Sequence, residues 1–508
     1  MVFRVLVAGY MTFIMHNKYK SLLAIVCTFM LAACGSHPSV PSSATAVDTI
    51  PTIFPDYTEV TVPCNIAPLN FMIQDTLSMS CVARFTAADG SVQTYGEGTK
   101  VLIPQDEWET MKKASLGKSL KVEVFSEVDG KWLSYKPFSI HIARDSMDSY
   151  VSYRLIQPSY GLYDKMNISQ RNISNFEETM IFNNKVSCNK VEGQCINCHS
   201  YQNYRTDNML FHVRVTNGGT VIVHNGKAKK INLKREGMIS AGVYPAWHPS
   251  MSLIAFSVNA THQWFHTSHV NKVEVFDDAS DLVLYDIEKD EVTTICADTT
   301  RLEVFPTWAP DGKYLYYCSA NTYKPDSTNT GDYRLDYQTV RYNLYRRAFD
   351  VQTHCFGEEE LVYQADSILR SVSLPRISPD GRFLVMAEGG HGYFNIWHHD
   401  ADIRILDLKN HIIVPSAEMN SMMDAESYPS FSSNGRWIMC ASRRVDGNFS
   451  RIFFSYFDGE KAHKAFLLPQ EDPEQNTLRL FSYNRPEFMI EPVHISLEEF
   501  AKVVGREE

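Results

Sequence analysis

A short segment that repeats four times constrains the fold of this chain more than any other feature. Each copy begins with a large apolar or aromatic residue followed by proline, and each leads into an apolar run. In three copies an Asp-Gly or Asn-Gly pair precedes that run. The copies are Tyr244–Pro249, Phe305–Gly312, Leu374–Gly381 and Tyr428–Gly435. The Asp-Gly pair is typical of a tight hairpin turn between two strands. Four units with one sheet each predict a β-propeller, in which blades bury their faces against their neighbours.

The repeat resembles the TolB-type propeller repeat, in which Pro-x-aromatic-Ser-Pro-Asp-Gly precedes an apolar strand. His248 and Ala309 depart from the serine of that pattern, and the first copy lacks the turn pair. The resemblance implies a TolB-like propeller over residues 206–508. Four clear copies, strands around Met209–Leu233 and a closing C-terminal segment together predict six blades.

The chain ahead of the propeller divides into further parts. Residues 35–55 are rich in Ser, Pro, Ala and Thr, which predicts a flexible tether. Residues 56–145 carry short runs of alternating apolar and polar residues, interrupted by a helical stretch at Pro104–Ser115, and predict a β-sandwich. Residues 146–205 have few strand patterns and are expected to be irregular. The predicted fold class is therefore all-β, with an N-terminal sandwich, an irregular segment and a propeller.

The sharpest chemical motif, Cys195-x-x-Cys198-His199, lies in the segment expected to be irregular. Two thiols at this spacing can bond to both vinyl groups of a haem, and the adjacent histidine can bind the iron. Roughly 0.008 matches are expected by chance in a chain with this content of Cys and His. The alternatives are a zinc site, a redox-active thiol pair and a disulfide. Zinc normally needs a second ligand pair, and only Cys188 is near in sequence.

The motif resembles the haem-attachment motif of c-type cytochromes. The resemblance implies one covalent haem c, with both cysteines as attachment points and His199 as an axial iron ligand. No compact helical cytochrome domain is evident, so we expect the sandwich or the propeller to cover the haem. His212 and Met209 are the nearest typical candidates for a sixth ligand, Tyr201 and Tyr204 are alternatives, and an open iron site is another. For each of these side chains an ordinary structural role is also open.

Two more groups of histidines lie in predicted loops. One holds His262, His266 and His269 with Trp264, and the other holds His391 with the run Trp397–Asp400. Gathered at one propeller face, such residues would build a ligand pocket. We expect them instead to be scattered over surface loops.

Residues 1–34 are typical of an export signal. Lys18 and Lys20 precede the apolar run Ser21–Leu31, which is too short to span a bilayer comfortably. The Leu-Ala-Ala-Cys sequence that ends at Cys34 resembles the bacterial lipoprotein signal, which implies cleavage before Cys34 and acylation of its thiol. An ordinary secretory signal is the alternative. We expect a lipid-anchored protein of the cell envelope, at the outer membrane and facing the periplasm.

Charge and motif content narrow the function classes. The net charge of −11 argues against a nucleic-acid partner, and the sequence contains no Gly-rich nucleotide loop, zinc-protease pair or nucleophile elbow. The whole pattern is similar to propeller lipoproteins of the Bacteroides group that carry a haem motif. The first hypothesis is electron transfer through the haem, with the propeller docking a protein redox partner. An interaction module with a structural or sensory haem, and a haem oxidoreductase with an open iron site, are the alternatives.

Overall fold

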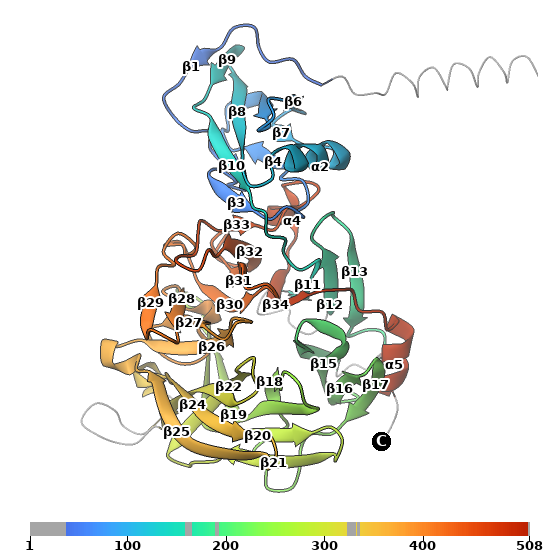
Figure 1. Cartoon of the computed structure of the whole chain (residues 1–508), viewed down its shortest axis with the longest axis vertical. Helices are drawn as coiled ribbons and strands as arrows, with labels where there is room; N and C mark the ends of the chain where they lie inside the picture. The colour runs from blue at the N-terminus through green and yellow to red at the C-terminus, as the bar shows by residue number, and fades with distance from the viewer. Residues whose placement is uncertain (1–36, 158–164, 188–192, 323–331, 333–335, 506–508) are drawn as a thin grey trace, which may run out of the picture.

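The computed structural model describes residues 37–157, 165–187, 193–322, 332 and 336–505. Strands dominate this part of the chain. A small N-terminal domain stands against the outer side of a ring of sheets, as Figure 1 shows. This arrangement confirms the predicted all-β fold with a propeller after an N-terminal β domain. Cys34 and the rest of the predicted signal lie outside the described residues.

The N-terminal domain consists of two sheets and one helix. The helix α2 (Gln105–Ala114) is close to the predicted stretch and buries Trp108 and Met111 in the domain core. In the seven-stranded sheet the members are β1 (Thr45–Ala46), β3 (Val60–Val62), β5 (Ser78–Thr86), β6 (Val92–Tyr95), β8 (Ser119–Val128), β9 (Lys131–Ser134) and β10 (Phe138–Ile142). The three-stranded sheet contains β2 (Ile53–Phe54), β4 (Phe71–Ile73) and β7 (Lys100–Val101). Strands β1 and β2 come from residues expected to form the tether.

The propeller has six blades of four strands each, and the innermost strand of each blade lies nearest the central axis. From the inside outward, blade 1 is β34 (Ser482–Met489), β11 (Tyr150–Ile156), β12 (Met166–Asn172) and β13 (Glu178–Asn183). Blade 2 is β14 (Gln194–Gln202), β15 (Arg205–Val215), β16 (Gly219–His224) and β17 (Lys227–Ile231). Blade 3 is β18 (Val243–Trp247), β19 (Leu253–Phe265), β20 (Val273–Asp286) and β21 (Glu291–Cys296).

The remaining three blades follow the same order. Blade 4 is β22 (Arg301–Trp308), β23 (Tyr314–Asn321), β24 (Asn343–Asp350) and β25 (Cys355–Tyr363), joined to blade 3 through the pair Ser280–Leu302. Blade 5 is β26 (Ser371–Ile377), β27 (Phe383–Gly389), β28 (Asp402–Asp407) and β29 (Ile412–Val414). Blade 6 is β30 (Glu426–Phe431), β31 (Trp437–Ser442), β32 (Arg451–Tyr456) and β33 (Phe466–Leu467).

Strands from both ends of the propeller sequence close the ring. The C-terminal strand β34 pairs with β11, which follows directly after the N-terminal domain. The propeller therefore begins at Tyr150 and not at residue 206. The segment 146–205, expected to be irregular, supplies three strands of blade 1 and the innermost strand of blade 2. Its strands contain many polar residues, which hid them from a search for apolar alternation.

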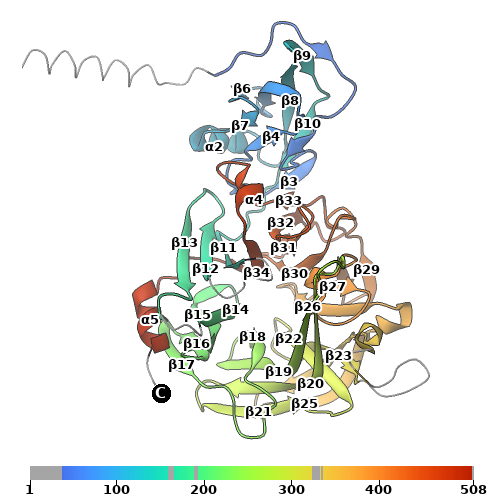
Figure 2. The ribbon, with the colours of Figure 1, turned by 180° about the vertical axis from the view of Figure 1, so that it is seen from behind.

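Three short helical turns and two helices complete the described structure. The turns are η1 (Tyr337–Thr339), η2 (Asp366–Ile368) and η3 (Asn395–Trp397). Helix α4 (Gln475–Leu478) lies between the two domains, and α5 (Leu497–Gly505) packs against the outer parts of blades 1 and 2, as Figure 2 shows from behind. The N-terminal domain binds the chain after blade 6 through Lys100, whose Nζ lies 2.9 Å from carboxylate oxygens of Asp472 and Glu474.

Candidate functional site

All six innermost strands of the propeller contain a β-bulge at the same position. At each bulge one residue has a positive φ, between 49° and 55°, and the pairing register with the neighbouring strand shifts. Five of the six are followed by proline; the residues are Cys198, Tyr244, Phe305, Leu374, Tyr428 and Arg485. A bulge turns the following side chains toward the other face of a strand. Blade 2 thus carries Cys198-His199 where the other blades carry a residue followed by proline.

The bulge brings the two motif cysteines to one cavity. In a regular strand, residues three apart point to opposite faces, so Cys195 and Cys198 would be separated. With the bulge at Cys198, both cysteines line a cavity of about 810 Å³ between blades 1, 2 and 3, at the end of the ring where the innermost strands begin. We call this space the thiol cavity. Tyr244, Tyr428 and Arg485 belong both to its lining and to the ring around the central axis.

His212 lines the thiol cavity beside the motif. It lies on β15 directly opposite Asn197, in the strand that pairs with the motif strand. Its Nδ1 is 2.8 Å from Thr220 Oγ1, whereas its buried Nε2 has no partner among the described residues. Burial, together with the nearby Arg214, holds the pKa of His212 well below its usual range. The ring is therefore neutral, with one nitrogen oriented by Thr220 and the other available to a metal ion.

The structure separates the two predicted candidates for a sixth ligand. Met209 is fully buried in an apolar cluster with Phe211 and Val213 and is absent from the lining of the thiol cavity. His212 lies on the opposite face of the same strand because their positions differ by an odd number. Tyr201 and Tyr204 are also outside the lining.

His199 follows Cys198 in the bulge but does not line the thiol cavity. Its ring is completely buried, and burial, Arg485 and Arg154 hold its pKa well below the usual range. The backbone of Ser152 lies near the ring. Neither ring nitrogen has a hydrogen-bond partner of good geometry among the described residues. The ring is thus neutral and unsatisfied, and in this arrangement it stands apart from the thiols.

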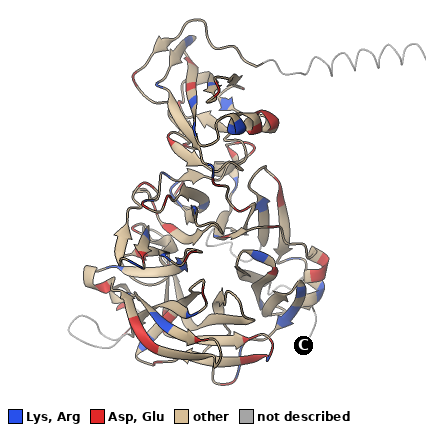
Figure 3. Ribbon diagram, in the orientation of Figure 1, with Lys and Arg blue, Asp and Glu red and all other residues tan. Residues whose placement is uncertain are grey.

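The thiol cavity has a cationic lining in an otherwise acidic chain. Arg154, Arg214, Lys234 and Arg485 line it, and none of the described lining residues is Asp or Glu. Over the rest of the chain, acidic and basic residues are interspersed, as Figure 3 shows, and the net charge is −11. The Cys198 thiol is one of the groups that raise the pKa of the Arg485 guanidinium, against the effect of burial. Such a lining favours an anionic ligand.

A haem c fits most of these features. Both thiols face the space that the macrocycle would enter, a neutral histidine offers an unpartnered nitrogen there, and four cations can balance two propionates. The position of His199 outside the lining is the feature that fits less well. For the zinc alternative, the thiols have no third donor close enough to complete a cluster among the described residues. Cys188 lies outside them.

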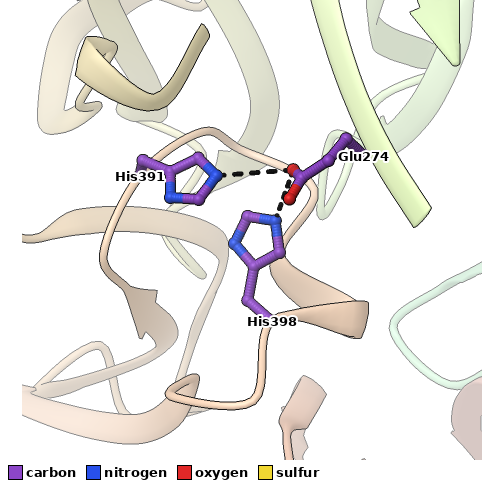
Figure 4. Close-up of side chains that lie close together, drawn as sticks. All are labelled: Glu274, His391 and His398. Atoms are coloured by element: carbon purple, nitrogen blue, oxygen red, sulfur yellow. Dashed lines mark hydrogen bonds and ion pairs between the residues drawn. The ribbon is translucent and has the colours of Figure 1, made fainter. Parts of the chain in front are cut away.

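A second cluster of ligand-type side chains lies between blades 3 and 5. The carboxylate of Glu274 is 2.8 Å from His398 Nε2 and 3.4 Å from His391 Nε2, as drawn in Figure 4. Burial alone would raise the pKa of Glu274, but the hydrogen bonds from the two histidines lower it to about 2. We call these three residues the Glu–His cluster. The prediction that His391 and His398 are scattered on the surface is wrong.

The other predicted histidine group stays apart from both sites. His262 bonds to Asp278 at 2.6 Å, and the rings of His266 and His269 lie 5.3 Å apart in the hairpin between β19 and β20. None of the three lines the thiol cavity. Glu274 could not be predicted as the partner of His391 and His398, because more than a hundred residues separate it from them in the sequence.

Fold and cavity define a six-bladed β-propeller protein with a cysteine-lined, cationic cavity beside its central axis. No protein-family model and no curated protein sequence matches the chain. Among solved structures it is similar to TolB from Acinetobacter baumannii, with 12% identity, a TM-score of 0.43, and coverage of 76% of this chain and 85% of that chain.

Two further solved structures have the same kind of similarity. A putative TolB from Agrobacterium tumefaciens has 12% identity and a TM-score of 0.37 over 65% of this chain and 94% of that chain. The β-propeller domain of the Trilobed protease from Pyrococcus furiosus has 12% identity and a TM-score of 0.34 over 69% and 91% of the two chains. These are similarities of fold alone. No helix among the described residues is long and apolar enough to cross a membrane.

Proposed function

We propose that this protein carries one haem c, bonded to Cys195 and Cys198 in the thiol cavity. The observation that carries the proposal is the convergence of both motif thiols on one large cavity, although regular strand geometry would separate them. The bulge is a feature of every blade. In five blades the bulge residue is followed by proline, whereas in blade 2 it is Cys198, followed by His199. The strand can thus hold the motif without a helical cytochrome domain.

The lining of the cavity supplies roles for the neighbouring residues. Arg154, Arg214, Lys234 and Arg485 would be the residues to bind the two propionates, since each is a cation in a lining without described carboxylates; Arg485 also lies 3.5 Å from a carboxylate oxygen of Glu487, outside the lining. His212 could supply Nε2 as an iron ligand, because Thr220 occupies its other nitrogen and burial keeps the ring neutral. For His199 we keep the role of iron ligand that the motif implies.

When bound, the haem supplies a one-electron couple. We propose that the protein transfers electrons to or from a protein partner, with the propeller as the docking surface. Residues of blades 1, 2 and 3 supply most of the lining of the cavity that would hold the haem. Two alternatives remain. One is a structural or sensory haem in an interaction module. The other is an oxidoreductase whose iron has an open sixth coordination position.

The location in the cell is part of the same proposal. Haem c is attached outside the cytoplasm, and the Leu-Ala-Ala-Cys sequence ending at Cys34 provides an export signal and an acylation site. We propose a lipid anchor at Cys34 in the outer membrane, with the propeller in the periplasm. Replacing Cys34 by Ser should abolish acylation and move the protein from the membrane fraction to the soluble one. An unchanged distribution would contradict the anchor without affecting the haem.

Haem staining after denaturing electrophoresis tests the cofactor, because thioether bonds survive denaturation and coordinate bonds do not. Protein matured with the haem-attachment machinery should stain, and Cys195→Ser with Cys198→Ser should abolish the stain. Cys355→Ser is the matched control, since Cys355 is an exposed free thiol on the outer strand of blade 4. A wild-type chain without stain would refute the proposal.

The reduced-minus-oxidised spectrum then separates the three functions. A low-spin spectrum supports the electron carrier, since both axial positions are filled. A high-spin spectrum that changes on adding carbon monoxide or cyanide supports the open-site oxidoreductase. A low-spin haem that no redox partner in the periplasm reduces or oxidises supports the structural role.

A further inference from the structure

We propose that Glu274, His391 and His398 bind one divalent transition-metal ion, independently of the haem. Glu274 lies on β20 of blade 3, and both histidines lie in the connection between β27 and β28 of blade 5. Each residue offers one ligand atom, and these atoms lie within 4.8 Å of one another. It is the one such group of three or more His, Cys, Asp or Glu residues in the described part of the chain.

The side chains already have the orientation that a metal requires. In Figure 4 both imidazole rings point Nε2 toward the Glu274 carboxylate, and the ring centroids are 4.4 Å apart. Two imidazoles and one carboxylate are ligands of Zn²⁺ and of other first-row transition metals, whereas Ca²⁺ and Mg²⁺ prefer oxygen ligands alone. Three protein ligands leave a fourth position for water, as in zinc sites that are not purely structural.

Hydrogen bonding within the cluster leaves polar atoms unsatisfied. Both histidines share one carboxylate oxygen, while Glu274 Oε1 and His398 Nδ1 are buried without a partner among the described residues. Unpaired buried polar atoms are costly, so a purely structural network would be expected to satisfy them. A cation bound to Nε2 of both histidines and to the carboxylate would give Glu274 Oε1 a partner, and both rings would keep their present orientation; His398 Nδ1 would not take part.

Solvent access to the cluster is limited to one side. The side chains of Glu274 and His398 are 3% and 1% exposed, whereas that of His391 is 15% exposed. The ring of Tyr337 lies against His391, with 5.8 Å between centroids. An ion can therefore enter beside His391 and then be held in a largely dry site, where competition from water is weak.

The metal would fasten blade 5 to blade 3 across the end of the ring. Two hydrogen bonds already join the same segments: Tyr393 Oη donates to Asp277 Oδ1 at 2.9 Å, and the His399 backbone N–H donates to Asn271 Oδ1 at 3.1 Å. Val275, adjacent to Glu274, lines the thiol cavity on the opposite face of β20. The ion would thus fix one wall of that cavity.

Metal binding can be measured on the full mature chain after treatment with a chelator. Isothermal titration with Zn²⁺ should show one site per chain, no comparable binding of Ca²⁺, and a rise in Tm with Zn²⁺. Co²⁺ should give the visible absorption of a site with nitrogen ligands. His391→Ala, the least buried position, and Glu274→Gln should each weaken Zn²⁺ binding at least tenfold.

Two controls keep the result specific. His463→Ala removes a histidine of similar type, paired with Asp458 at 2.7 Å in blade 6, and should leave Zn²⁺ affinity unchanged. A variant with Cys195→Ser and Cys198→Ser should also keep the site, which separates it from zinc bound at the motif and from any failure of the haem proposal. Stoichiometric binding that survives both cluster variants, or no binding by a folded wild-type chain, would overturn the inference.

Discussion

Replacing Asp277 by Asn should stabilise the protein at neutral pH, although the aspartate makes three good hydrogen bonds. Asp277 is fully buried on β20 and accepts hydrogen bonds from Asn259 Nδ2 at 2.6 Å, Thr261 Oγ1 at 2.7 Å and Tyr393 Oη at 2.9 Å. All three donors are neutral. Burial therefore dominates over them and raises the pKa of Asp277 from 3.8 to about 6.

The sign of the effect follows from this shift. The folded chain holds the proton more tightly than the unfolded chain, so the contribution of Asp277 is fully present below pH 3.8 and is lost as the pH rises through about 6. A shift of this size corresponds to about 3 kcal/mol, and the hydrogen bonds to the charged form are already included in it. Asn cannot ionise, and its amide can be accommodated if the Asn259 side chain turns over. We expect Asp277→Asn to gain about 1–3 kcal/mol at pH 7 and nothing at pH 4.

Urea unfolding between pH 4 and pH 7.5 measures this difference. The free energy of unfolding of the variant minus that of the wild type should grow with pH and level off above about pH 6.5. Asp278→Asn is the matched control, because Asp278 is the next residue but is partly exposed and paired with His262. A difference that does not vary with pH, or one that Asp278→Asn reproduces, would refute the reasoning.

Three further predictions concern single residues. His212→Ala should convert a low-spin haem spectrum to a high-spin one, and an unchanged spectrum would exclude His212 as a ligand. Phe500→Ala should destabilise the chain by about 3–5 kcal/mol in urea unfolding, because the Phe500 side chain of α5 is fully buried against Phe182 of blade 1 and Phe211 of blade 2. Gly312→Ala should cost at least about 1 kcal/mol more than Gly381→Ala. Both glycines have φ near +72°. A Cβ at Gly312 would lie 2.5 Å from the His248 ring, whereas a Cβ at Gly381 would lie 3.8 Å from its nearest neighbouring atom. Equal losses of unfolding free energy in the two variants would contradict this prediction.

The repeat predicted the propeller because its turn chemistry is local. The residue before each proline adopts the positive φ of the bulge, so Tyr244, Phe305, Leu374 and Tyr428 mark four blades directly in the sequence. Arg485-Pro486, which precedes an apolar run, is a fifth copy of the repeat. It was not recognised because its first residue is an arginine and not an apolar or aromatic residue. Blade 2 could not be found in this way, because Cys198-His199 replaces the pair altogether.

The sites were less predictable because they depend on ring closure. The motif identified the two thiols, and spacing alone placed His212 and Met209 on equal terms; only the strand face separates them. The cations of the thiol cavity come from blades 1 and 2 and from the C-terminal strand, and no local pattern joins them. Glu274 meets His391 and His398 only because blades 3 and 5 converge at one end of the ring.

Intact-mass measurement of the mature protein tests the central claim most directly. Protein produced in a periplasm with the haem-attachment machinery should exceed the mass of its mature, acylated chain by one haem. The variant with Cys195→Ser and Cys198→Ser should lack that increment and remain folded, since neither cysteine forms a disulfide. A wild-type chain at the mass of the bare polypeptide and its lipid, with both thiols free to react, would contradict the account.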